Sequence, residues 1–132
     1  MKESASPQLD DEILALERAA LVRWCQGDPS GYLEICADDI VYFDPFIERR
    51  IDGLAALRTY YESLRGKISA PRWEILDPLV QHSGNIAVLT FHFVSGGGSE
   101  GGLRWNSSET YRHGSEGWRL IHSHWSFAQS KR

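Results

Sequence analysis

Apolar residues recur every three or four positions in the first half of the chain, which is the spacing of a helix that packs on a core. One such stripe covers residues 10–27, where acidic residues stand in the expected first turn and a glycine ends the pattern. Asp28 followed by Pro29 is a helix-start signal, which predicts a second, short helix over residues 29–37. A third amphipathic helix is predicted over residues 54–66, where a glycine provides the C-cap.

The second half of the chain has short apolar runs, which predict strands. The run over residues 73–80 contains Asp77-Pro78, and we expect an edge or bulged strand there because proline cannot donate to a sheet ladder. The run over residues 86–94 is apolar on both faces, as expected of a central strand that is covered on both sides. Further strands are predicted over residues 40–43, 103–111 and 118–127. Helices followed by a run of strands indicate an α+β fold, in which a curved sheet wraps the helices and encloses a cavity.

The size and composition of the chain fit one domain. It has 132 residues, 42 % of them hydrophobic, and we expect a flexible tail over residues 1–9 and a single domain over residues 10–132. The net charge is −4 and Arg49-Arg50 is only a pair, so we expect no nucleic-acid partner. We expect no membrane partner either, since no apolar run approaches membrane-spanning length, and we expect no secretory signal. The two cysteines match no zinc or redox spacing and are interpreted as reduced core thiols of a cytoplasmic protein.

Three stretches of the chain resemble a known family. They read GDPSGYLEICADDIVYFDP from residue 27, IDGLAALRTYYESL from residue 51, and SSET-YRHGSEG-WRLIHSHWS from residue 107. Their order and spacing resemble the SnoaL-like and ketosteroid-isomerase-like branch of the NTF2-like superfamily, from about residue 10 onwards. The resemblance implies a cone of three N-terminal helices packed on a strongly curved mixed or antiparallel sheet. The chain is also similar to the association domain of calcium/calmodulin-dependent protein kinase, which is an oligomerising hub.

The resemblance to ketosteroid isomerases implies a set of catalytic residues. Asp44 stands where those enzymes keep a general base, and Glu109 stands where they keep a neutral carboxylic acid that donates to an oxyanion. Ala20 stands where they keep the oxyanion tyrosine, so that donor is missing here, whereas Tyr61 matches a supporting tyrosine.

The chemistry of the two acids depends on whether they share a dry cavity. If they do, burial and mutual repulsion should raise the pKa of at least one of them above about 4, so that one acts as a base and the other as a neutral donor. A structural alternative stays open for both. Asp44 would then cap the turn at its proline, and Glu109 would pair with Arg104 or Arg112 across strands.

Either face of the last predicted strand could be the buried one. One face holds Leu120, His122, His124 and Ser126, because side chains alternate along a strand. The other face holds Ile121, Ser123, Trp125 and Phe127. The apolar pattern buries this second face, whereas the resemblance implies that the histidine face lines the cavity. Both faces can be buried if the convex side of the sheet packs on a partner subunit, which predicts a homodimer built on Ile121, Trp125 and Phe127.

His122 and His124 are candidates for catalysis, because a histidine can act as a base or an acid near neutral pH. The alternatives are a structural His122 that is hydrogen-bonded to a nearby tyrosine or to Glu109, and a zinc site completed by His92 or a carboxylate. A single His-x-His pair without a fixed partner is weak support for metal, and we expect none. The predicted substrate-binding residues are Ala20, Trp24, Tyr60, Tyr61, His92 and Ser126, with Trp73 and Trp105 as further aromatic candidates.

The sequence therefore predicts a small-molecule site, in an isomerase-like enzyme or in a ligand-binding protein. In the enzyme, Asp44 removes a proton next to a carbonyl, and Glu109 or a histidine stabilises the developing oxyanion. We expect chemistry without a cofactor, because no nucleotide, flavin or haem motif occurs. The alternative function is an assembly module, in which the sheet face drives oligomerisation and the pocket is vestigial.

Overall fold

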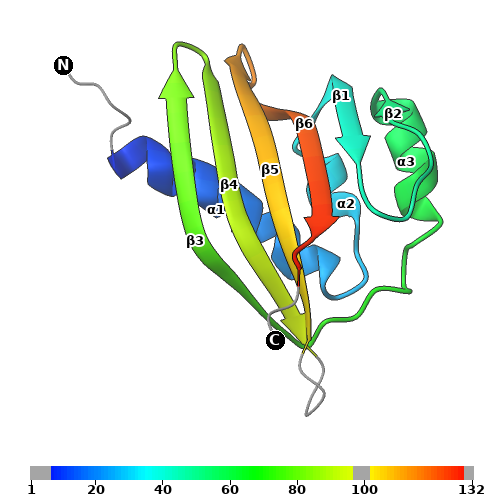
Figure 1. Ribbon diagram of the computed structural model, residues 1–132. Helices are drawn as coiled ribbons and strands as arrows, with labels where there is room; N and C mark the ends of the chain where they lie inside the picture. The colour runs from blue at the N-terminus through cyan, green and yellow to red at the C-terminus, as the bar shows by residue number, and fades with distance from the viewer. Residues whose placement is uncertain (1–6, 97–101, 130–132) are drawn as a thin grey trace.

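The protein is described by a computed structural model that covers residues 7–96 and 102–129. A strongly curved six-stranded sheet forms one layer, and the helices pack on one of its faces without the sheet closing into a barrel (Figure 1). This confirms the predicted α+β cone. The tail predicted over residues 1–9 falls mostly outside the described residues, and the first helix begins within that range, at Pro7.

The first and last strands of the chain lie side by side in the sheet. The elements are α1 Pro7–Trp24, α2 Ser30–Leu33, β1 Cys36–Phe43, β2 Ile51–Asp52, α3 Leu54–Glu62, β3 Arg72–Ser83, β4 Ile86–Gly96, β5 Gly102–Gly114 and β6 Gly117–Phe127. The strand order is β2-β1-β6-β5-β4-β3, with β1 parallel to β6 and the other neighbours antiparallel. In the described part of the chain, no helix is long and apolar enough to cross a membrane.

A tight junction joins the first two helices. Gly27 ends the first helical segment with a φ of +88°, a conformation that suits glycine. The Oδ1 atom of Asp28 then accepts a hydrogen bond from the backbone N–H of Ser30 at 3.0 Å, which closes a turn before α2. The N-cap position is Pro29, one residue later than predicted. A Cβ atom on Gly31 would stand 3.1 Å from the Cα of Ala20, so α1 and α2 are in close backbone contact at this point.

The sheet has two distinct faces because side chains alternate along each strand. On the face that α1 and α2 cover, the cross-strand neighbours Leu89, Glu109 and Ser123 are all buried. On the opposite face, the neighbours Thr110 and His122 are only half-buried. No helix of the described residues lies on that opposite face, which is called the uncovered face below (Figure 1). The core and any enclosed hollow therefore belong to the covered face.

Apolar packing holds the helices on the covered face. Ile13 and Leu21 of α1, Leu57 of α3, Leu89 of β4 and Leu120 of β6 are each at most 1 % exposed. Burial of a side chain of this size stabilises the fold by about 1.5–3 kcal/mol relative to its exposure.

Besides shifts of a few residues at the ends of several elements, the observed elements differ from the predicted ones in three places. The second helix is a single turn, and β1 begins at Cys36 because that residue already pairs with Leu120 of β6. Cys36 is therefore in a strand rather than a helix, and Cys25 follows α1; both are free and buried, as expected. The third difference is β2, whose two residues are too short to give a periodic signal.

Strand β3 lies at the edge of the sheet and carries the predicted irregularity. Its register with β4 shifts between Leu76 and Leu79, and Asp77 has a φ of +54°, which Asp tolerates better than most residues. Pro78 thus falls in a bulge, which confirms the prediction. The prediction that β4 is covered on both faces does not hold within one chain, because only every second residue of Ile86–Gly96 is buried.

Candidate functional site

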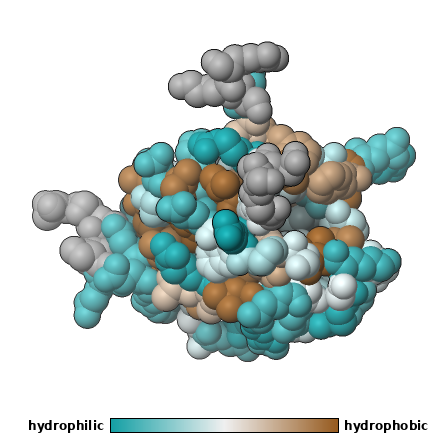
Figure 2. All heavy atoms as spheres, turned by 90° about the horizontal axis from the view of Figure 1, so that it is seen from below, coloured by the Kyte–Doolittle hydropathy of each residue, from teal (hydrophilic) through white to brown (hydrophobic). Residues whose placement is uncertain are grey.

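A cavity of about 580 Å³ lies between the helices and the covered face of the sheet. Its lining residues are Leu21, Trp24, Cys25, Tyr32, Tyr42, Asp44, Phe46, Tyr60, Tyr61, Leu64, Lys67, Ile68, Ser69, Ala70, Phe93, Ser95, Leu103, Trp105 and Trp125. Several of them come from the end of β4 and the start of β5, at the lower end of the molecule in Figure 1. Figure 2 views that end and shows hydrophobic side chains gathered between polar ones. A mainly apolar hollow with a few polar groups is typical of small-molecule sites, which measure about 300–1,000 Å³.

Asp44, directly after β1, is the one acid among the described residues that line the cavity. Its Oδ2 atom accepts hydrogen bonds from the phenols of Tyr42 at 2.8 Å and Tyr60 at 2.7 Å. Its Oδ1 atom accepts one from the backbone N–H of Phe46 at 2.7 Å, which closes the turn at Pro45. The turn-capping role considered from the sequence is therefore present together with a position on the cavity wall.

The two phenols beside Asp44 are permanent hydrogen-bond donors. Burial raises the pKa of Tyr42 well above its usual value, and the neighbouring Tyr61 and Asp44 add to this effect. Burial, followed by the hydrogen bond to Asp44, also raises the pKa of Tyr60. Because Tyr42 lies on β1 and Tyr60 on α3, two different elements hold the carboxyl group in one orientation.

Aromatic rings form two sides of the cavity. Near Asp44, the ring of Tyr61 packs on Trp24 at a centroid distance of 4.8 Å and on Tyr42 at 5.4 Å. From β5 and β6, Trp105 and Trp125 meet edge to face at 6.1 Å. Such pairs stabilise a structure by about 0.5–1.5 kcal/mol beyond the burial of their area, so these walls are stiff. A flat, largely apolar ligand would meet ring faces and edges on both sides.

One side of the cavity rim is fastened to the end of α1. The backbone N–H of Gly66 donates to the carbonyl of Gly27 at 2.9 Å, and that of Ala70 donates to the carbonyl of Cys25 at 2.9 Å. The segment between Gly66 and Ala70 contributes several lining residues, so this side of the rim is tied to the fold by its backbone.

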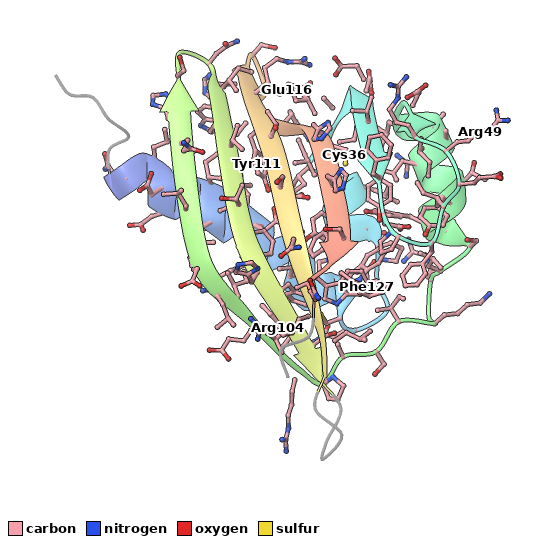
Figure 3. The ribbon with its side chains drawn as sticks, viewed as in Figure 1. Cys36, Arg49, Arg104, Tyr111, Glu116 and Phe127 are labelled. Atoms are coloured by element: carbon pink, nitrogen blue, oxygen red, sulfur yellow. The ribbon has the colours of Figure 1, made fainter. Side chains whose placement is uncertain are left out.

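The other side of the rim is formed by Phe46, which has no such attachment through its side chain. Phe46 is 69 % exposed. The centroid of its ring lies 6.1 Å from that of Trp105 and 5.7 Å from that of Phe127. Phe127 lies at the lower end of β6 (Figure 3), which places this contact at the rim.

A pair of fully buried acids lies behind the cavity wall: Glu17 of α1 and Glu109 of β5, called the carboxyl pair below. Glu17 accepts hydrogen bonds from the phenols of Tyr32 at 2.5 Å and Tyr111 at 2.6 Å. Glu109 accepts one from the hydroxyl of Ser123 at 2.6 Å through its Oε2 atom. Tyr111 lies toward the upper end of β5, away from the rim (Figure 3). Glu109 does not line the cavity, so the expectation that it shares one hollow with Asp44 is not met.

Sequence analysis did not identify Glu17, nor Tyr42, the donor to Asp44 on β1. Glu17 lies four residues after Ile13 and four before Leu21, so helical periodicity alone places it on the buried stripe of α1. An acid on an apolar stripe is a usable signal, because a carboxyl group is almost never fully buried without a partner.

Four of the predicted site residues meet at the cavity: Asp44, Trp24, Tyr60 and Tyr61. Ala20 is 2 % exposed and does not line the cavity, because it is part of the α1–α2 contact. The arginine partners considered for Glu109 are not used; Arg112 instead pairs with Asp39 at 3.0 Å. Trp105 lines the cavity, whereas Trp73 packs on Phe93 beside it.

The histidine face of β6 points away from the cavity, contrary to the position that the resemblance implied. His122 pairs with Thr110 and His124 with Ser108, on the face opposite the buried Glu109–Ser123 pair. His92 and Ser126 are both cross-strand neighbours of Asn106, so they lie on the same uncovered face. Burial and the nearby His124 lower the pKa of His122. Side-chain alternation along β6 predicted the shared face of these residues correctly, but it failed for Leu120, which is buried because the register with β5 shifts beside it.

The same alternation changes the predicted dimer surface. Trp125 lines the cavity, and Phe127 packs on Trp105 on the cavity side, with a ring-centroid distance of 4.5 Å. Ile121 stands at the register shift between β5 and β6. A dimer through the uncovered face of the sheet would therefore not use Trp125 or Phe127.

Metal ligands do not gather anywhere in the described residues. No group of three or more His, Cys, Asp or Glu side chains is placed there to hold an ion. Within the part of the chain that the structure describes, the histidines of the uncovered face thus have no third ligand with which to form a zinc site.

A helical layer over one face of an open mixed sheet, with an aromatic cavity between them, defines the class of this protein, and comparison with known proteins gives its family. The model of the SnoaL-like domain matches residues 15–130. The chain therefore belongs to the SnoaL-like family. The comparison with curated proteins found no match.

Solved structures support this assignment. A candidate ketosteroid isomerase from Parabacteroides distasonis ATCC 8503 is 36 % identical, with 92 % of this chain and 89 % of that chain covered and a TM-score of 0.82. An NTF2-like protein of unknown function from Pseudomonas putida KT2440 is 25 % identical, with 96 % and 92 % covered and a TM-score of 0.83. The CaMKII hub of S. rosetta shares the fold at 22 % identity, with 94 % and 98 % covered and a TM-score of 0.74.

Proposed function

We propose that this protein binds a flat, largely apolar small molecule in the cavity and removes a proton from it, with Asp44 as the general base and without a cofactor. The observation that carries the proposal is the position of Asp44, a carboxyl group held by two phenols on the wall of an aromatic cavity of about 580 Å³. The likeness to a candidate ketosteroid isomerase supports the same type of chemistry.

The proposed step takes a proton from a carbon next to a carbonyl group. The C–H bond breaks, an O–H bond forms on Asp44, and the electron pair moves to the carbonyl oxygen as an enolate. Before the step, Tyr42 and Tyr60 donate to the Asp44 carboxylate. Once Asp44 carries the proton, it accepts these bonds less strongly, so the phenol of Tyr60 becomes free to donate to the enolate oxygen. Tyr60 thus has the oxyanion-stabilising role that the sequence-based hypothesis gave to Glu109 or a histidine. Glu109, His122 and His124 do not line the cavity.

Hydrogen–deuterium exchange tests this step without knowledge of the natural substrate. The probe is 2-tetralone, a bicyclic ketone with exchangeable protons next to its carbonyl, followed by NMR in D2O. The wild-type protein is expected to accelerate the exchange, and Asp44→Asn is expected to reduce it to the buffer background because the amide cannot accept the proton. Binding is measured in parallel by the fluorescence of the cavity tryptophans Trp24, Trp105 and Trp125.

The matched control is Asp38→Asn, which changes an exposed acid on the same strand, β1, that leads to Asp44. It should leave exchange at the wild-type rate. Exchange by Asp44→Asn at the wild-type rate would remove Asp44 from the mechanism, and unchanged tryptophan fluorescence would remove 2-tetralone as a ligand of the cavity.

A second candidate function, self-association, is favoured by the uncovered face of the sheet. No helix of the described residues lies on it, yet Phe43 and His124 pack there with ring centroids 5.2 Å apart. A CaMKII hub and a CaMKII association domain are among the structures of the same fold.

Light scattering with size-exclusion chromatography tests this second function. We expect the wild-type protein to elute as an oligomer and Phe43→Glu to elute as a monomer, because a buried unpaired charge would disfavour the contact. Thr59→Glu, on the exposed side of α3, is the control and should keep the wild-type size. A monomeric wild-type protein at high concentration would exclude assembly through this face.

A further inference from the structure

The carboxyl pair, Glu17 and Glu109, brings two acids together where neither can reach water. Both side chains are 0 % exposed, and the two carboxyl groups are close enough to share a hydrogen bond. Two adjacent carboxylates without a cation would repel each other strongly in the interior of a protein. Among the described residues, no Lys, Arg or His forms an ion pair with either acid. One of the two groups must therefore carry a proton.

The hydrogen-bond donors around the pair show which group carries it. Both oxygens of Glu17 already accept a hydrogen bond, Oε1 from Tyr111 and Oε2 from Tyr32, as an ionised carboxylate does. Glu109 accepts from Ser123 at Oε2, while its Oε1 atom has no donor among the described residues. A proton on Oε1 of Glu109, donated to Glu17, satisfies every oxygen of the pair.

The same hydrogen bonds lead to the cavity on two sides. Tyr32, which donates to Glu17, lines the cavity. Trp125 also lines it, and its indole N–H donates to the hydroxyl of Ser123 at 3.1 Å. Since Ser123 in turn donates to Glu109, two aromatic side chains of the cavity wall are oriented by the pair behind them.

We propose that Glu109 is a neutral carboxylic acid whose proton is donated to an ionised Glu17, and that this one proton positions Tyr32 and Trp125 on the cavity wall. Glu109 and Glu17 are thus positioning residues, since neither touches the hollow itself. The part that concerns ligand affinity rests on the proposed small-molecule function, whereas the place of the proton does not.

The surroundings of the pair support this assignment. Burial, followed by the charge of Glu17, raises the pKa of Glu109 well above its usual value. Burial also raises the pKa of Glu17, but the phenols of Tyr111 and Tyr32 oppose that rise, so Glu17 is the stronger acid of the two. The titratable groups that act on the pair from the surrounding elements are Tyr32 of α2, Cys36 of β1, Tyr61 of α3 and Tyr111 of β5. All four have raised pKa values and are neutral, so none compensates a second negative charge.

The direction of the pH dependence follows from this raised pKa. The stabilising contribution of the Glu109 proton is fully present below the pKa of Glu109 in the unfolded chain, which is about 4.3. It is lost as the pH rises through the raised pKa of the folded protein, because a second carboxylate then forms in the core.

Infrared spectroscopy at pH 8 locates the proton. We expect the wild-type protein to show the carbonyl stretch of a protonated carboxyl group, and Glu109→Gln to lack it, because the Gln amide can donate to Glu17 in place of the acid. Absence of the band from the wild-type protein would overturn the proposal without any variant. Persistence of the band in Glu109→Gln would place the proton on Glu17 and overturn it as well.

The positioning role is measured by pH titration from neutral to alkaline pH. The fluorescence of Trp125, isolated as the difference between the wild-type protein and Trp125→Phe, should change as Glu109 loses its proton and should stay constant in Glu109→Gln. The Kd for 2-tetralone should rise about three- to tenfold over the same range in the wild-type protein only, which corresponds to roughly one hydrogen bond. Identical pH profiles of the wild-type protein and Glu109→Gln would overturn the positioning role. If 2-tetralone does not bind, the proposed function fails, while the infrared and fluorescence results still decide this inference.

Discussion

Replacement of Glu17 by alanine is expected to lower the free energy of unfolding by about 2–6 kcal/mol, because two buried phenols lose their acceptor at about 1–3 kcal/mol each. Tyr32 and Tyr111 are 3 % and 0 % exposed, so water cannot replace the carboxylate without a rearrangement of the core. The proton donor of the pair, Glu109, would lose its partner as well.

Urea denaturation followed by circular dichroism measures this change. The control is Glu12→Ala, which removes an exposed acid from the same helix and should change stability by less than about 0.5 kcal/mol. A loss in Glu17→Ala no larger than that of the control would mean that the phenols do not depend on Glu17.

Replacement of Ala20 by tyrosine is expected to destabilise the protein by at least about 3 kcal/mol, because the new side chain has no space between α1 and α2. Ala20 is 2 % exposed, and the backbone of Gly31 lies directly against it. The substitution would restore the residue type that ketosteroid isomerases keep at the matching position, yet we expect it to separate the helices rather than create an oxyanion donor.

Thermal unfolding compares this variant with Ala19→Tyr, which places the same side chain on the exposed side of α1. The control should keep a wild-type Tm, whereas Ala20→Tyr should unfold at a much lower temperature. Equal Tm values would show that the helix contact can open to admit a tyrosine, and would restore Ala20 as a position next to the cavity.

The last strand shows which kind of sequence argument was reliable. Side-chain alternation placed Trp125 and Phe127 on the buried side of β6, and the structure agrees. The resemblance placed His122 and His124 in the cavity, and there the analogy failed. Alternation is a geometric property of any strand, whereas the use of a face by relatives depends on side chains that this sequence does not share.

The two candidate acids were found from the sequence, but their partners were not. Asp44 was predicted on the cavity wall, where it lies between two tyrosines of different elements. Glu109 was expected to interact with Asp44 or an arginine and instead pairs with Glu17, which is 92 positions away along the chain. Such a contact depends on how α1 lies across β5, and no local pattern specifies it. What the sequence did contain was the apolar spacing around Glu17, which already indicated a buried acid in need of a partner.

The unequal attachment of the cavity rim has a consequence for how a molecule could reach Asp44. Backbone hydrogen bonds tie the segment between Gly66 and Ala70 to the end of α1, so that side cannot widen unless they break. The backbone of Phe46 is hydrogen-bonded to Asp44, but its side chain is held at the rim by ring contacts, and a change of its rotamer would enlarge the opening at a small cost in free energy. We therefore expect ligands to enter and leave the cavity past Phe46. The size of that one ring should then limit the size of the largest ligand that can enter.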